Sequence, residues 1–215
     1  MDEVFSFYYT ESLDVFRKLG AEIIPFSPLH DKELPENIHG LILGGGFPEM
    51  FLEQLSANIS MHTSIKSTAA KGLPIYAECG GLMYLCREIS SFSGASYPMV
   101  NLVPAVCEMQ NKLQTVGYVE ALSLEDNVLI KNGEKLRGHE FHFSLMKPDK
   151  KNTFPWAFQF TKMRTGQQYA GGYVKENILA SYLHMHFMGN EKAAASFVNR
   201  CLSYKESQCL EAHSL

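Results

Sequence analysis

The sequence predicts a single α/β domain with a mostly parallel sheet. Apolar runs bounded by glycine, proline and acidic turns alternate with helical patterns as far as Ser90, which is typical of βαβ units. The 215 residues suit one hydrophobic core rather than two. Hydrophobic residues make up 46% of the chain and charged residues 20%, a globular composition that excludes disordered, collagen-like and coiled-coil chains.

The first part of the chain supplies the predicted parallel strands. Leu13, Phe16 and Leu19 recur at helical spacing before Gly20, which suits the end of a helix. Asn58 interrupts a second helical pattern. The expected strands are 4–9 (or its frayed end), 21–26, 38–43 and 73–78, and the expected helices are 11–19, 50–70 and 82–89.

Beyond Ser90 the pattern changes to short strands, which we expect to add antiparallel neighbours to the same sheet. These strands are 114–122, 134–144, 158–161 and 178–187, and a helix at 190–204 follows them. The domain is therefore expected to span residues 1–204, with residues 205–215 as a frayed C-terminal tail.

Charge and cysteine usage exclude several classes of partner. The net charge of −4 and the pI near 6.1 offer no basic face for nucleic acid. The five cysteines are widely spaced and contain no C-x-x-C pair, so we expect reduced thiols. An acidic N-terminus, and no apolar run near the ~18 residues that a membrane span needs, predict a cytoplasmic protein without a membrane segment.

The strand at 73–78 breaks at Cys79-Gly80-Gly81 and continues as a helix. A cysteine on such a sharp turn is exposed above the carboxyl end of the sheet, beside the positive end of the helix dipole, which lowers a thiol's pKa. Two small residues after it fit a nucleophile elbow. The alternative is a small buried residue at the end of a strand, because free cysteines are often buried.

Four histidines in two strand-like segments are candidates for the base that a thiol nucleophile needs. His184 and His186 share one face of SYLHMHF, and His139 and His142 flank Glu140 in RGHEFHF. Each could equally be an ordinary core or surface histidine. A zinc site is disfavoured, since the chain has neither H-E-x-x-H nor a paired cysteine motif.

The segment Gly44-Gly45-Gly46-Phe47-Pro48-Glu49 follows a strand and allows backbone N–H groups to turn toward a ligand, as an oxyanion hole requires. The alternative is a tight turn. It is not a phosphate loop, because G-x-x-x-x-G-K-[ST] is absent from the chain and G-x-G-x-x-G does not fit it.

Taken together, LILGGGFPEM, PIYAECGGLMYL, LRGHEFHFS and ASYLHMHF resemble the glutamine amidotransferase domain of cobyrinic acid a,c-diamide synthase. The order and spacing match from about Phe5 to Leu202. The elbow alone is shared with many class I, triad-type amidotransferases, whereas the whole set points to the corrinoid branch.

The resemblance implies a flavodoxin-like, doubly wound α/β fold with helices on both faces of the sheet, and hydrolysis of glutamine to glutamate and ammonia. The family's nucleophile falls on Cys79 and its histidine on His184. The oxyanion donors fall on the backbone of Gly45, Gly46 and Gly80. The segment from Arg137 to Ser144, including His139, is a candidate wall of the glutamine pocket.

Two departures from the family pattern carry consequences. Many triad-type amidotransferases place a glutamate two residues after the histidine, where this chain has His186. We therefore expect a Cys-His dyad with modest activity that depends on a partner, and Glu140 or His186 as a substitute orienting group. The second departure concerns the synthetase part: this chain has no phosphate loop, so it is expected to hold no cofactor. ATP and Mg²⁺ would bind a synthetase domain or subunit.

The resemblance begins near Phe5, so the family's opening strand is expected to be shortened and the adjacent sheet edge open to a partner or to a second copy in a homodimer. The leading hypothesis is a glutaminase supplying ammonia for a,c-diamidation of cobyrinic acid. The amidotransferase part of nickel-sirohydrochlorin a,c-diamide synthase and a catalytically degenerate binding module are the alternatives. A small cysteine hydrolase of similar fold is a third, against which GGGFPE argues.

Overall fold

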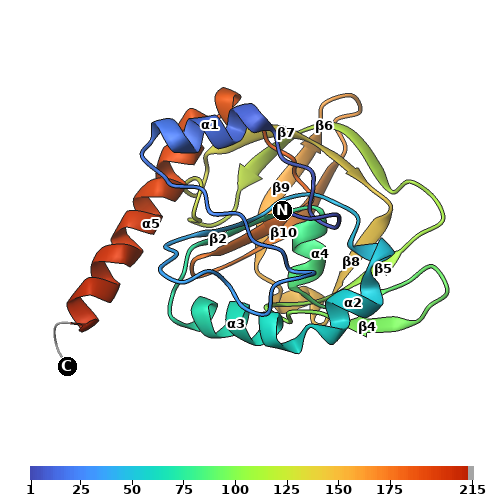
Figure 1. Cartoon of the computed structure of the whole chain (residues 1–215). Coiled ribbons are helices and arrows are strands. Elements are labelled where there is room, and N and C mark those ends of the chain that lie inside the picture. Colours follow the sequence, from blue (N-terminus) through green and yellow to red (C-terminus); the bar gives the residue numbers. More distant parts are fainter. Residues whose placement is uncertain (213–215) are drawn as a thin grey trace.

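A seven-stranded mixed sheet runs through the computed structural model, which describes residues 1–212 (Figure 1). In spatial order its strands are β1 (Leu41–Leu43), β2 (Ile75–Glu78), β11 (Ile178–Ser181), β10 (Gln168–Lys175), β9 (Trp156–Lys162), β6 (Thr115–Ser123) and β7 (Lys135–His142). A smaller sheet beside it has the order β4 (Ser96–Pro98), β3 (Cys86–Ser90), β5 (Val103–Met109) and β8 (Ser144–Pro148).

The predicted α/β class is confirmed, but the parallel part of the large sheet is smaller than expected. Only β1, β2 and β11 are parallel neighbours, and the pairs from β11 through β7 are antiparallel. The physical reason lies near the N-terminus. Segment 4–9 contributes a single bridge, from Phe7 to Gly45, and segment 21–26 is irregular chain, so two of the expected strands do not pair in the sheet.

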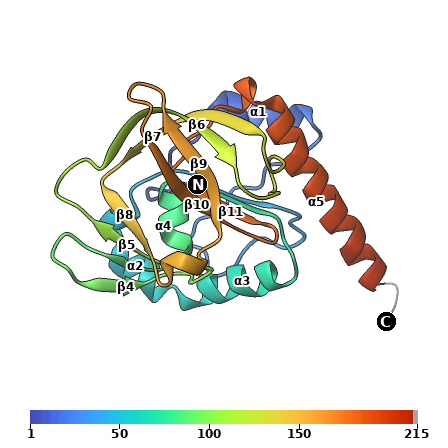
Figure 2. The same ribbon diagram turned by 180° about the vertical axis from the view of Figure 1, so that it is seen from behind.

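Helices cover both faces of the large sheet, as predicted (Figure 2). Along β2 the side chains alternate, so Ile75 and Ala77 join one buried cluster while Tyr76 joins the other. The helices on the Ile75 side are α2 (Leu52–Ala57), α3 (Ile59–Ala70) and α4 (Gly80–Leu85), and those on the Tyr76 side are α1 (Thr10–Lys18) and α5 (Glu191–Ala212). The predicted interruption at Asn58 is confirmed, because its side chain accepts the Met61 N–H as the cap of α3.

Several predicted boundaries differ in the structure, and the strand expected at 178–187 ends at Ser181, so His184 and His186 lie beyond it. The helix expected to run through residue 89 ends at Leu85, and the next residues form β3 between β4 and β5. In a short apolar run, periodicity does not distinguish a helix from a strand. Here the pairing of β3 with its neighbouring strands determines that the segment is a strand. The segment expected to be a frayed tail from residue 205 is helical as far as Ala212. It is the end of α5, which extends away from the rest of the molecule (Figure 1). Residues 213–215 of that tail lie outside the described residues.

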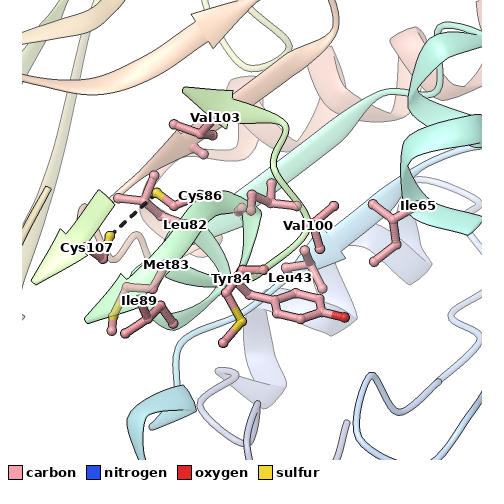
Figure 3. Close-up of a cluster of buried hydrophobic side chains, with 14 of the residues drawn as sticks. Leu43, Ile65, Leu82, Met83, Tyr84, Cys86, Ile89, Val100, Val103 and Cys107 are labelled. Atoms are coloured by element: carbon pink, nitrogen blue, oxygen red, sulfur yellow. Dashed lines mark hydrogen bonds between the residues drawn. The ribbon is translucent and has the colours of Figure 1, made fainter. Parts of the chain in front are cut away.

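The core around α4 joins both sheets (Figure 3). Leu82, Tyr84 and Leu85 are fully buried and belong to one cluster with Leu43 of β1 and Ile65 of α3. Gly81 lies so close to β1 that an added Cβ would stand 2.4 Å from the Leu43 carbonyl oxygen. The elbow helix is therefore pressed directly against the sheet.

A cavity of about 390 Å³ lies beside β1, at the edge of the large sheet. Residues 20–26, 37–42 and the middle of α5 line it, and neither Cys79 nor His184 is among the lining residues. The edge of the sheet at β1 is thus bordered by a groove, distinct from the site described below. Within residues 1–212, no helix combines the length and apolar character that crossing a membrane requires.

Gly81→Ala is expected to lower the free energy of unfolding by about 1–3 kcal/mol, because the new methyl group overlaps the backbone of β1. Urea unfolding followed by circular dichroism measures the loss. Gly189→Ala is the matched control, since no atom lies within 4 Å of the added Cβ, and it should change stability by less than about 0.5 kcal/mol. Equal unfolding midpoints for the two variants would contradict the packing argument.

Candidate active site

Cys79 occupies the sharp turn between β2 and α4, as the sequence predicts. Its φ of 48° and ψ of −102° are rare for a residue with a side chain. The turn is held by the Cys79 N–H, which donates to the Ser181 carbonyl at 2.8 Å, and by the Cys79 carbonyl, which accepts the Met83 N–H at 3.1 Å. Such strain, of order ~1–3 kcal/mol, is characteristic of functional sites.

The Cys79 thiol is neutral at rest. Only 8% of the residue is exposed, and burial raises the pKa of the thiol to about 12, with the charges of Glu49 and Glu78 adding to the effect. This reverses the expectation that the α4 N-terminus lowers the pKa. The Gly80 N–H does act in that direction, but desolvation and two carboxylates outweigh it. The thiol therefore needs a base to become a nucleophile.

His184 lies on the loop that follows β11, next to β2. The register pairs Ser181 with Glu78, so Cys79 and His184 both follow the carboxyl ends of adjacent parallel strands. His184 exchanges two backbone hydrogen bonds with His139 of β7, at 2.8 and 3.1 Å, and the two imidazole rings stack with their centroids 5.0 Å apart. The edge of β7 thus fixes the His184 backbone.

Glycine at position 138 permits this contact. An added Cβ would lie 2.3 Å from the His184 carbonyl oxygen, so a larger residue would push β7 away from the loop. The RGHEFHFS segment therefore contacts the His184 loop through His139, and its role as a wall of the glutamine pocket stays a prediction. Burial and the neighbouring His184 lower the pKa of His139, which favours its neutral form.

The predicted oxyanion glycines lie together. An added Cβ on Gly80 would stand 3.0 Å from the Gly46 amide nitrogen, and one on Gly45 would stand 2.7 Å from Cε1 of His184. Phe7 donates its N–H to the Gly45 carbonyl at 3.1 Å and holds the loop in place. The Gly44–Gly46 turn therefore lies against both the elbow and the His184 ring. A glycine run that served only to make a tight turn would not need these two contacts.

The structure adds a residue that the sequence did not single out. Glu78 places Oε2 at 3.6 Å from Nδ1 of His184, and both side chains are buried. Its Oε1 accepts the Met185 N–H at 3.2 Å and a short hydrogen bond from the Tyr76 hydroxyl. The signal was present as a charged residue ending an otherwise apolar strand, where carboxylates are rare unless paired.

Neither predicted orienting group contacts the His184 ring. Glu140 is buried and accepts a short hydrogen bond from the Tyr169 hydroxyl. His186 is partly exposed, packs its ring 4.7 Å from that of Tyr9 and lies 4.0 Å from the Glu11 carboxylate. Glu140 alternates with His139 along β7, so its side chain lies on the face opposite the residue that stacks on His184. His186 does not share a strand face with His184, because β11 ends at Ser181 and the chain that follows is irregular.

The guanidinium of Arg137, predicted to contribute to substrate binding, lies on the surface of β7. Its side chain is 72% exposed, and Nη2 stands 3.6 Å from the Glu120 carboxylate of β6. Arg137 shares its face of the strand with His139, so a role at the rim of the pocket stays a prediction.

Within residues 1–212 no hydrogen bond joins the Cys79 thiol to His184. The thiol donates instead to the Phe141 carbonyl at 3.9 Å. Catalytic hydrogen bonds are often long before substrate binds, so the dyad stays a prediction that the shared location supports. Over the same residues, no group of three or more histidine, cysteine or acidic side chains is arranged to hold a metal ion.

An elbow cysteine, a glycine loop beside it and a histidine on the loop after the adjacent strand match the arrangement expected of a class I glutamine amidotransferase. Residues 1–192 match the model of the CobB/CobQ-like glutamine amidotransferase domain, and the chain belongs to that family. It is 44% identical over 203 residues to cobyrinate a,c-diamide synthase of Caldanaerobacter subterraneus, covering 94% of this chain and 44% of that protein. The enzyme of the same name from Dehalococcoides mccartyi strain 195 is 46% identical, and the match covers 92% of this chain and 42% of that protein. The chain thus spans less than half the length of these relatives.

Solved structures support the fold. A glutamine amidotransferase matches with a TM-score of 0.58 at 15% identity, covering 91% of this chain and 93% of that one. A glutamine amidotransferase from Thermotoga maritima matches with a TM-score of 0.55 at 14% identity, covering 94% and 78%. The predicted flavodoxin-like amidotransferase fold is therefore confirmed.

Alkylation of Cys79 by iodoacetamide should be slow at neutral pH and rise about tenfold per pH unit from pH 7 to 9. The reason is that a raised pKa leaves little thiolate over this range. Peptide mass mapping measures the rate at Cys79, with the exposed Cys209 as an internal check of the reagent. A rate that is already constant between pH 7 and 8 would show that the thiol is ionised at rest.

Proposed function

We propose that this chain is the glutaminase part of an ATP-dependent amidating enzyme, releasing ammonia from the side chain of glutamine. The observation that carries the proposal is Cys79 on a strained elbow beside the Gly46 amide, with His184 on the neighbouring strand end. Membership of the CobB/CobQ-like amidotransferase family supports it.

In the first half of the reaction His184 takes the proton of the Cys79 thiol, and the thiolate attacks the carboxamide carbon of glutamine. The oxygen of the tetrahedral intermediate accepts hydrogen bonds from the amides of Gly46 and Gly80. As the C–N bond breaks, His184 returns the proton to the leaving nitrogen. Ammonia departs and a γ-glutamyl thioester of Cys79 remains.

In the second half a water molecule replaces ammonia. His184 removes a proton from the water, the hydroxide attacks the thioester carbon, and the proton goes to the departing sulfur. Glutamate and the Cys79 thiol are the products. Because both halves pass through an oxyanion at the same place, loss of one amide donor would slow each by a typical ~10²–10³-fold.

The proposed use of the ammonia is a,c-diamidation of cobyrinic acid. The relatives at 44% and 46% identity carry the name cobyrinate a,c-diamide synthase and are more than twice as long as the matched region. We propose that a synthetase domain or subunit binds ATP and Mg²⁺ and activates the carboxylates that receive the ammonia. A second copy of this chain at the open β1 edge is the other proposed partner.

Dependence on the synthetase follows from the resting site. A neutral, buried thiol without a hydrogen bond to His184 predicts low glutaminase activity in the isolated chain. Docking of a synthetase that tightens the contact between Cys79 and His184 would raise it. This is the proposed mechanism by which glutamine is spared when no acceptor is being amidated.

Cys79→Ala should lower glutamate release from glutamine by more than about 10⁴-fold, since no other group can form the thioester. Glutamate is measured by a coupled dehydrogenase assay with and without a cobyrinate a,c-diamide synthase synthetase domain. Cys209→Ser on the exposed side of α5 is the control and should keep the parent activity.

Two results would contradict the proposal. Activity of Cys79→Ala equal to that of the parent chain would remove the nucleophile. No glutamate release by the parent chain, and no labelling of Cys79 by a glutamine-like electrophile with the synthetase present, would favour the degenerate binding module instead.

A further inference from the structure

The carboxylate of Glu78 faces the Nδ1 atom of His184. We propose that Glu78 is the positioning residue for His184, accepting its Nδ1–H and leaving Nε2 unprotonated to receive the proton of Cys79. The inference rests on the glutaminase function proposed above. It assigns the orienting acid to the residue that immediately precedes the nucleophile, in place of the glutamate expected two residues after the histidine.

The polar atoms of the pair have few alternatives. Nδ1 of His184 is buried and has no hydrogen-bond partner within the described residues, and Oε2 of Glu78 lies 3.6 Å away. The side chains are only 6% and 10% exposed, so neither atom is well supplied by solvent. A buried donor without a partner costs ~1–3 kcal/mol, and a small rotation of the imidazole would close this distance to a hydrogen bond.

Glu78 is itself held in place on its other oxygen. Oε1 accepts the Tyr76 hydroxyl and the backbone N–H of Met185, so Oε2 is the oxygen left toward the ring. Met185 is the residue that follows His184. One carboxylate therefore fixes the backbone of the histidine loop through one oxygen and faces its imidazole with the other.

The chemistry of a histidine base explains what this contact supplies. Only one imidazole nitrogen is protonated in the neutral ring, and a carboxylate at Nδ1 selects the tautomer with a free Nε2. When His184 takes the thiol proton it becomes a cation, which the negative charge of Glu78 stabilises. Glu78 thus acts through His184 and does not touch the glutamine.

The other titratable groups around His184 cannot replace this effect. His139 stacks on the ring and has a lowered pKa, so it contributes no stable charge. Burial lowers the pKa of His142 to about 4, which keeps it neutral. Burial also raises the pKa of Glu140, whose carboxylate is occupied by Tyr169. Glu78 is the acid in contact with the ring.

Glu78→Gln removes the charge and keeps the size of the side chain. We expect kcat for glutamate release to fall about 10–100-fold with little change in KM, because the residue does not contact substrate. The acidic limb of the kcat/KM profile should move to lower pH, since the protonated imidazole loses the carboxylate that faces it. A role limited to packing would leave the position of that limb unchanged.

Glu140→Gln is the matched variant. Glu140 is equally buried, also accepts a tyrosine hydroxyl and lies on the neighbouring part of the site without contacting His184. Its substitution should shift the pH profile less than Glu78→Gln does, because the Glu140 carboxylate acts on His184 only from a distance. A shift of the profile in Glu140→Gln and none in Glu78→Gln would overturn the assignment.

Nitrogen-15 NMR of the histidine rings tests the inference without turnover. In the unsubstituted chain the signals of His184, assigned by their loss in His184→Gln, should show the tautomer protonated at Nδ1, and Glu78→Gln should reduce its population. Protonation at Nε2 in the unsubstituted chain would overturn the proposal even if Glu78→Gln failed to fold. Absence of glutaminase activity together with the Nδ1–H tautomer would instead contradict the proposed function alone.

Discussion

The parallel pairing of β2 with β11 is the constraint on which the site depends. Its register sets Ser181 opposite Glu78, and the Cys79 N–H extends the ladder by one more hydrogen bond to the Ser181 carbonyl. Both chains then leave the sheet at the same edge. The elbow and the histidine loop are neighbours because two parallel strands end together, although more than one hundred residues separate Cys79 from His184.

Close backbone approach is the second requirement, and glycine meets it at three contacts around the site. An added Cβ at Gly46 would overlap the Val4 carbonyl, at Gly81 the Leu43 carbonyl, and at Gly138 the His184 carbonyl. These positions belong to three separate sequence motifs. All three motifs contain glycine for the same reason. At each position one backbone segment lies directly against another, and no side chain fits between them.

The sequence predicted those parts of the site that a local pattern encodes. A strand followed by Cys79-Gly80-Gly81 identified the elbow, and the glycine run at Gly45 and Gly46 identified the loop that meets it. Glu78 was not predicted because its role depends on a partner far along the chain. No local pattern distinguishes a carboxylate at a strand end that faces a histidine from one that faces solvent. The prediction of a paired strand at 21–26 was wrong for a similar reason. A strand needs a neighbouring strand to pair with, and hydrophobic periodicity does not show whether one is present.

Burial has opposite effects on the two partners of the proposed reaction. It strengthens the field of Glu78 at His184, because few solvent molecules screen a contact between side chains 6% and 10% exposed. The same burial raises the pKa of the Cys79 thiol and keeps it neutral. A carboxylate that favours protonated His184 lowers the cost of forming the ion pair between imidazolium and thiolate, although it opposes the thiolate alone. The net effect of Glu78 is therefore favourable only when the proton passes directly from Cys79 to His184, which makes activity conditional on bringing those two side chains together.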